Sequence, residues 1–84
     1  MFSPIGNFIK VEQVENEAEQ NAKLPHLKTY KVLAIPGGLS TSLQQNDAVA
    51  INDSAVFSLP YTQGDRIKYE RFALVNSVVA RFSV

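Results

Sequence analysis

The stretch KTYKVLAIPGGLSTSLQQNDAVAIN, residues 28–52, contains two short apolar runs, VLAI and AVAI, separated by a linker rich in turn-forming residues. Valine and isoleucine favour strands, and strands that are apolar on both faces are typical of buried positions or interfaces. In the linker, PGG at 36–38 predicts a sharp turn, and Asn46 is expected to adopt a left-handed conformation in a second turn. The stretch therefore predicts two buried strands joined by a short connection.

Further strands are predicted on both sides of this pair. Residues 8–14 alternate between apolar and polar side chains, which indicates a strand. Residues 54–61 predict a third short apolar strand, ended by Pro60, and 61–72 predict a hairpin with its tip at 63–65. Residues 73–77 predict a turn of irregular or helical backbone before a last strand from Val78. About six short strands at regular spacing predict an all-β fold, a small barrel or sandwich; a barrel would leave no open edges.

Length and composition limit the function classes. A chain of 84 residues predicts one domain, 1–84, with a core small enough to need support from oligomerisation. The absence of cysteine excludes disulfides, one histidine argues against a zinc site, and a net charge of zero makes a nucleic-acid partner unexpected. The apolar runs are too short for a membrane helix, and the N-terminus does not resemble a secretory signal, so a soluble protein of the host cytoplasm or of a virion is expected.

Several groups of polar residues are candidate sites. Glutamates at 12, 15, 17 and 19 could bind a cation or a basic partner, but a solvated polar segment is the preferred interpretation. The segment has no glycine, which a calcium-binding loop needs at its bend. His26 has no neighbouring nucleophile motif, and the aspartates at 47, 53 and 65 sit beside predicted turns, where their side chains cap backbone N–H groups. The PGG turn has no GK[ST] sequence after it, so it is not expected to bind phosphate. No catalytic, metal or cofactor site is predicted.

The predicted hairpin carries the strongest indication of nucleic-acid binding. Aromatic and basic residues alternate along it: Tyr61, Arg66, Lys68, Tyr69, Arg71 and Phe72. Small barrels stack bases on such faces, but a barrel exterior or a subunit contact remains the preferred interpretation because the chain is neutral.

Four segments, taken in order, resemble the GroES-type co-chaperonin family over most of the chain. They are the opening strand with Pro4, Ile5, Asn7, Phe8, Ile9 and Val11; the strand and turn YKVLAIPGG at 30–38; LQQNDAV at 43–49, with Asn46 where the family has glycine; and LVNSVVA at 74–80. The linker at 37–47 stands where larger members carry a roof hairpin. The resemblance implies a barrel that assembles into sevenfold rings and has no catalytic activity.

The resemblance also implies a mobile loop that binds the chaperonin, here residues 15–29. The candidate anchors in it are Leu24, Pro25, His26 and Leu27. This loop departs from the family pattern, because it has no glycine and its two leucines are separated. Barrel-wall or subunit-contact roles are expected for Val32, Leu33, Ile35, Val78 and Val79.

Three functions follow as alternatives. The first is a compact, possibly phage-encoded, co-chaperonin that forms a homo-oligomer, caps a chaperonin and assists folding of a client such as a capsid protein. The second is a virion structural protein, such as a capsid decoration protein, built on the same barrel; the loop without glycine and the neutral charge favour it. The third is a small nucleic-acid-binding barrel. No enzymatic activity, cofactor or membrane association is expected.

Overall fold

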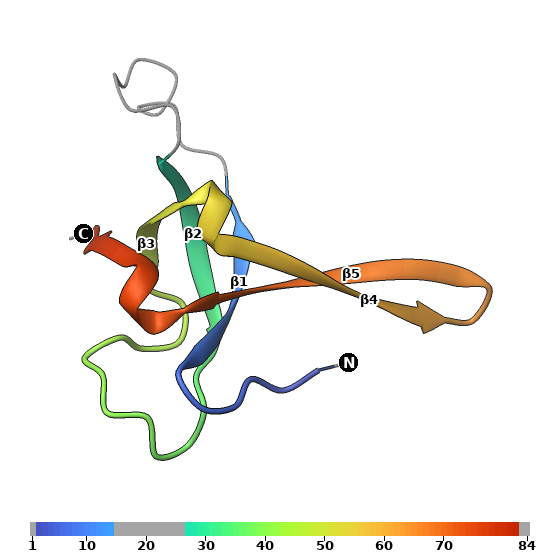
Figure 1. The fold of residues 1–84 in the computed structure, drawn as a ribbon, viewed down its shortest axis with the longest axis horizontal. Coiled ribbons are helices and arrows are strands. Elements are labelled where there is room, and N and C mark those ends of the chain that lie inside the picture. Colours follow the sequence, from blue (N-terminus) through green and yellow to red (C-terminus); the bar gives the residue numbers. More distant parts are fainter. Residues whose placement is uncertain (1, 15–26, 83–84) are drawn as a thin grey trace.

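The computed structural model describes residues 2–14 and 27–82, which form one antiparallel sheet and no α-helix (Figure 1). The sheet has the strand order β4-β5-β1-β2-β3-β6. Its strands are β1 (Phe8–Gln13), β2 (Leu27–Ala34), β3 (Ala48–Asn52), β4 (Val56–Gln63), β5 (Arg66–Leu74) and β6 (Val78–Arg81). Short 3-10 helices, η2 (Asp53–Ala55) and η3 (Val75–Ser77), precede β4 and β6. The all-β prediction is therefore confirmed, with six strands.

The core lies on one face of the sheet. Alternate residues of β1, β2 and β3, with Ala73 of β5, meet there, as the period of two in a strand requires. Its buried members are Ile9, Val11, Tyr30, Val32, Val49, Ile51 and Ala73. Ile35, Leu39, Leu43, Ala55, Val56, Val75 and Val78 are half-buried and pack against them. The linker after β2 and both 3-10 helices thus cover a core that the strands alone leave open.

The two strands predicted in residues 28–52 are present and pair directly as β2 and β3. In the linker, the N–H of Leu39 donates to the carbonyl of Pro36 at 3.2 Å, which closes the predicted turn. Asn46 has a φ of 75°, as predicted, and the N–H of Gln44 donates to Asp47 Oδ2 at 2.8 Å beside it. Local turn chemistry therefore fixes how the linker returns the chain to β3.

The prediction that Pro60 ends a strand is wrong. Strand β4 continues through it to Gln63, and Pro60 lies opposite Tyr69 of β5. β4 is an edge strand, and proline is tolerated there where its missing N–H faces away from the neighbouring strand. Residues 73–74, predicted as part of a turn, belong to β5, and only 75–77 turn.

β4 and β5 form a long hairpin that projects away from the other strands (Figure 1). They pair in register from Val56 and Ala73 to Gln63 and Arg66, and Gly64, with a φ of 65°, forms the predicted tip. At the opposite edge of the sheet, β6 pairs with β3. Among the described residues β4 and β6 do not pair with each other, so the sheet has two open edges.

Candidate functional site

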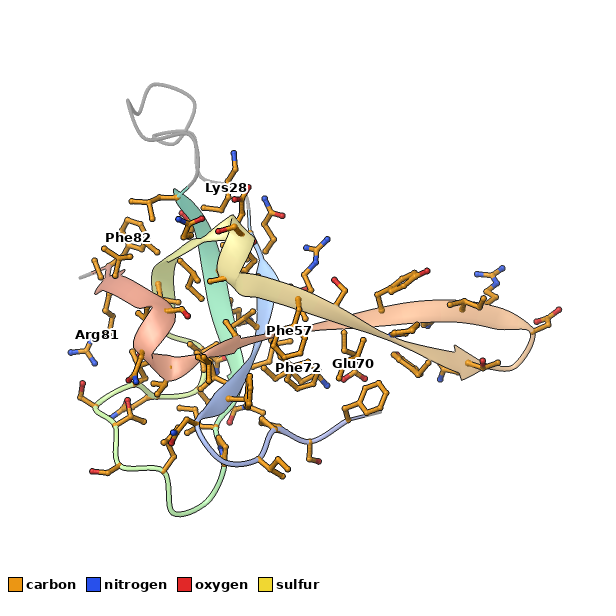
Figure 2. The ribbon with its side chains drawn as sticks, viewed as in Figure 1. Lys28, Phe57, Glu70, Phe72, Arg81 and Phe82 are labelled. Atoms are coloured by element: carbon orange, nitrogen blue, oxygen red, sulfur yellow. The ribbon has the colours of Figure 1, made fainter. Side chains whose placement is uncertain are left out.

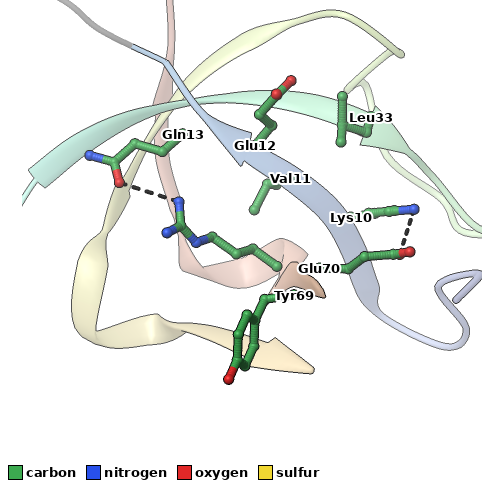
Figure 3. A pocket seen from close by; sticks show the side chains of 8 residues that line it. Lys10, Val11, Glu12, Gln13, Leu33, Tyr69 and Glu70 are labelled. Carbon is green, nitrogen blue, oxygen red and sulfur yellow. Dashed lines mark hydrogen bonds and ion pairs between the residues drawn. The ribbon is translucent and has the colours of Figure 1, made fainter. Parts of the chain in front are cut away.

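The strands β1 and β5 separate part-way along their length and form a fork. They pair from Phe8 opposite Leu74 to Val11 opposite Arg71. Beyond that point β1 continues on β2, and β5 continues on β4 into the projecting hairpin. A pocket of about 340 Å³ occupies the fork (Figure 3) and is lined by Lys10, Val11, Glu12, Gln13, Leu33, Tyr69, Glu70 and Arg71.

The register would bring two carboxylates together at the point where the strands separate. The next pair would place Glu12 directly opposite Glu70, because Val11 lies opposite Arg71. Two carboxylates facing each other across an antiparallel pair are destabilising. Glu12 is instead exposed to solvent, and Glu70 is buried and bound to a cation on its own face of the sheet.

That cation is Lys10, whose Nζ lies 2.6 Å from Glu70 Oε2 (Figure 3). The Lys10 side chain is 16% exposed and that of Glu70 is 7% exposed, so little water reaches the pair. The backbone N–H of Phe2 also donates to Oε2, at 3.3 Å. The hydrogen bond from Lys10 is the main cause that lowers the pKa of Glu70, and the N–H of Phe2 adds to it, whereas burial opposes both. Glu70 is therefore held as a carboxylate, although its Oε1 has no partner among the described residues.

A second contact crosses the fork on its exposed side. Arg71 Nη1 donates to Gln13 Oε1 at 3.4 Å (Figure 3). Both side chains are exposed, so this long hydrogen bond contributes little to stability. Among the described residues, the mouth of the fork is thus closed on this side by a contact that water or a ligand can replace.

An aromatic cluster covers the other side of the hairpin base (Figure 2). Phe57 stacks on Phe72 with ring centroids 6.1 Å apart, and Phe2 meets the edges of Tyr61 and Phe72. The N-terminal residues 2–5 leave an apolar hollow of about 240 Å³ beside Phe8 and Leu59. This cluster attaches the base of the hairpin to the N-terminal segment.

Within the part of the chain that the structure describes, the outer half of the hairpin has no such cover. Ile67 is 66% exposed and Tyr69 is 65% exposed, on one face of β5. Arg66 and Lys68 are also exposed, and they lie on the opposite face because successive strand residues alternate. The basic and aromatic residues that the sequence suggested as a nucleic-acid surface are therefore divided between two faces.

The β6 edge also exposes apolar side chains. Val79 is 63% exposed and Phe82, just after the strand, is 43% exposed. Arg81 ties this strand to the linker, since its Nη1 donates to the carbonyl of Ser42 at 3.0 Å and lies 3.6 Å from Asp47 Oδ2.

The structure distributes the predicted site residues unevenly. Leu24, Pro25 and His26, like Glu15, Glu17 and Glu19, lie outside the described residues. The loop predicted at 15–29 does not reach 29: its last three residues belong to β2, where half-buried Leu27 lies opposite Asn52.

The predicted wall residues differ in their surroundings. Val32 is fully buried in the core, and Ile35 and Val78 pack against it. Leu33 lines the fork, whereas Val79 is mostly exposed. Sequence reasoning missed the pair of Lys10 and Glu70, because alternation assigns each residue to a face of its own strand and only the register of β1 on β5 brings the two together.

Neither a protein-family model nor a curated protein matches the chain. Residues 2–14 and 27–82 contain no group of three or more histidine, cysteine, aspartate or glutamate side chains placed to hold a metal. Within the same ranges, no helix is long and apolar enough to cross a membrane. Among the described residues, the candidate binding surfaces are the pocket in the fork, the exposed outer hairpin and the β6 edge.

Proposed function

We propose that this protein is a non-enzymatic assembly protein of the co-chaperonin type, which forms a homo-oligomer, caps a chaperonin and assists folding of a client such as a capsid protein. The observation that carries the proposal is the β6 edge. It is an open strand edge beside two exposed apolar side chains, Val79 and Phe82. Open edges and exposed apolar groups of this kind are stabilised when another chain covers them.

The barrel architecture is part of the same proposal. The core draws residues from one face of the sheet, and the linker and η3 fold over that face. We infer that the sheet forms the wall of a partly open barrel. The four sequence segments that resemble GroES-type co-chaperonins support this inference, since they fall on β1, β2 with its turn, the start of β3, and η3 with β6.

A virion structural role, such as capsid decoration, is the second candidate. Residues 15–29 contain no glycine, and Leu27 is part of β2 rather than of a free loop. Compared with the family's mobile loop, this segment is shorter, because its last residues belong to β2, and its two leucines are separated. It therefore offers a chaperonin less apolar surface. A subunit that binds only an assembled lattice through β6 has no need of such a loop.

Native mass spectrometry of the protein, alone and with a bacterial chaperonin and ADP, tests the proposal. We expect a ring-sized oligomer that adds to the chaperonin, and loss of this addition in Leu24→Ser. Leu24→Ser is preferred to Leu27→Ser because Leu27 is half-buried in β2. Leu59→Ser, at an exposed leucine on the hairpin, is the matched control.

The outcomes separate the two candidates. An oligomer that Val79→Asp dissociates and that binds the chaperonin supports the co-chaperonin function. An oligomer or monomer that ignores the chaperonin but binds assembled capsids supports the virion role. A monomer that binds neither refutes both.

A further inference from the structure

We propose that the fork between β1 and β5 binds an extended peptide of a partner protein, which inserts as an additional strand and carries acidic side chains at alternate positions. The proposal does not depend on the co-chaperonin function. It rests on the backbone edges that face the fork, on the pocket between them and on the charges of β5.

Both strands continue past their last shared pair, Val11 opposite Arg71. Glu12 and Gln13 remain on β2, and residues 66–70 remain on β4, but within the described residues no strand pairs with the edges that these two segments turn toward each other. Unpaired strand edges are templates for an extended chain, which supplies the missing backbone hydrogen bonds. An inserted segment therefore has a strand to pair with on either side.

The position of Pro60 shows which backbone groups of β5 face the fork. Proline has no N–H, so within a strand it is tolerated where that position points away from the neighbour. In an antiparallel pair, two directly opposite residues either both point their backbone N–H and C=O groups toward each other or both point them away from each other. Since Pro60 lies opposite Tyr69, the N–H and carbonyl of Tyr69, and by alternation those of Ile67, point into the fork.

Pro60 also makes the outer edge of β4 a poor alternative. It removes a donor from the middle of that eight-residue strand, on the side away from β5. No proline lies in β1 or β5. Of the two edges of the hairpin, the β5 edge at the fork is thus better suited to pair with an added strand than the outer edge of β4.

The space between the edges suits a polar chain. Its volume of about 340 Å³ falls in the range of ligand pockets, and its lining includes charges of both signs. The long hydrogen bond between Arg71 and Gln13 is the contact that an entering chain has to displace. Glu70, whose Oε1 is buried and has no hydrogen-bond partner among the described residues, is one of the residues that line this space.

The side chains of β5 define the chemistry of the peptide. On one face Lys10 neutralises Glu70, while Lys68 and Arg66 are exposed and form no ion pair within the described residues. On the other face Ile67 and Tyr69 are two-thirds exposed. A strand that pairs with β5 along Arg66 to Tyr69 matches both faces there when its residues alternate between acidic and apolar, whereas next to Glu12 of β1 the repulsion between carboxylates favours an uncharged residue.

The test uses a short, end-blocked peptide of alternating valine and glutamate, titrated into the full-length protein and followed by amide NMR shifts. We expect shifts on both edges of the fork, at Glu12 and Gln13 and at Ile67 and Tyr69. A peptide of alternating valine and lysine serves as the charge control. Lys68→Glu is expected to weaken binding of the glutamate peptide by roughly fivefold or more and to strengthen binding of the lysine peptide.

A matched pair of proline variants tests the backbone contacts. Ile67→Pro removes an N–H that faces the fork, whereas Thr62→Pro, directly opposite, removes one from the outer edge of β4. We expect Ile67→Pro to abolish binding and Thr62→Pro to leave it unchanged. Absence of shifts at millimolar peptide, equal affinity for both peptides, or equal effects of the two proline variants overturns the proposal.

Discussion

Two isoleucine-to-alanine substitutions, one in the core and one in the outer hairpin, are expected to lower the free energy of unfolding by different amounts. Ile51 is fully buried in β3 and Ile67 is 66% exposed in β5. Ile→Ala removes three carbon groups, which at about 0.8 kcal/mol each gives about 2.4 kcal/mol for a buried side chain. The cavity left at Ile51 raises this to about 3–4 kcal/mol, whereas at Ile67 only a third of the side chain is buried and about 0.8 kcal/mol is lost.

Thermal and urea unfolding measure the difference. A domain of this size has a total stability of about 4–13 kcal/mol, and each kcal/mol moves Tm by about 4–8 °C. Ile51→Ala is therefore expected to lower Tm by about 12–32 °C and Ile67→Ala by about 3–6 °C. Equal losses refute the reasoning, since they mean that another part of the molecule, or another copy of it, covers the hairpin. A loss at Ile51 below about 1 kcal/mol means that the core is elsewhere.

Two further predictions concern Glu70 and Asn46. Because Lys10 lowers the pKa of Glu70 from its usual 4.5, the pair stabilises the fold fully above pH 4.5 and loses this effect as the pH falls through the lower pKa of the folded state. Glu70→Gln should therefore flatten the acid side of a stability–pH profile from urea unfolding, and a parallel profile contradicts this. Asn46 has a φ of 75°, so Asn46→Ala is expected to cost about 1 kcal/mol and Asn46→Gly to be neutral or stabilising in the same assay; a loss in Asn46→Gly as large as in Asn46→Ala contradicts the conformational argument.

Local sequence patterns predicted most of the fold. Alternation identified β1, β-branched runs identified β2 and β3, and glycine at the tip identified the hairpin. Asn46 adopts the left-handed conformation because its turn requires one there, which depends only on nearby residues. These features are local, so one sequence contains the information for them.

The open edges and the fork were not predicted, because they depend on the register between strands far apart in the chain. Pro60 was interpreted as a strand end, although its effect depends on whether its nitrogen faces a neighbour, which only the pairing with β5 decides. The pair of Lys10 and Glu70 likewise needs the register of β1 on β5. The strand order that leaves β4 and β6 at the edges is a property of the whole sheet.

One register links these separate observations. Pairing of Phe8 with Leu74 places Glu12 opposite Glu70, and charge repulsion then favours separation of β1 and β5 at that point. Lys10 lies opposite Phe72, so Glu70, two residues away on the same face, is its diagonal neighbour, and beyond Val11 no strand among the described residues pairs with the edge of β5 that faces β1. A two-stranded hairpin in water is only marginally stable without further packing. Glu12 and Glu70 thus mark the point beyond which, among the described residues, β5 has an unpaired edge on a hairpin that gains stability when a third strand fills the gap.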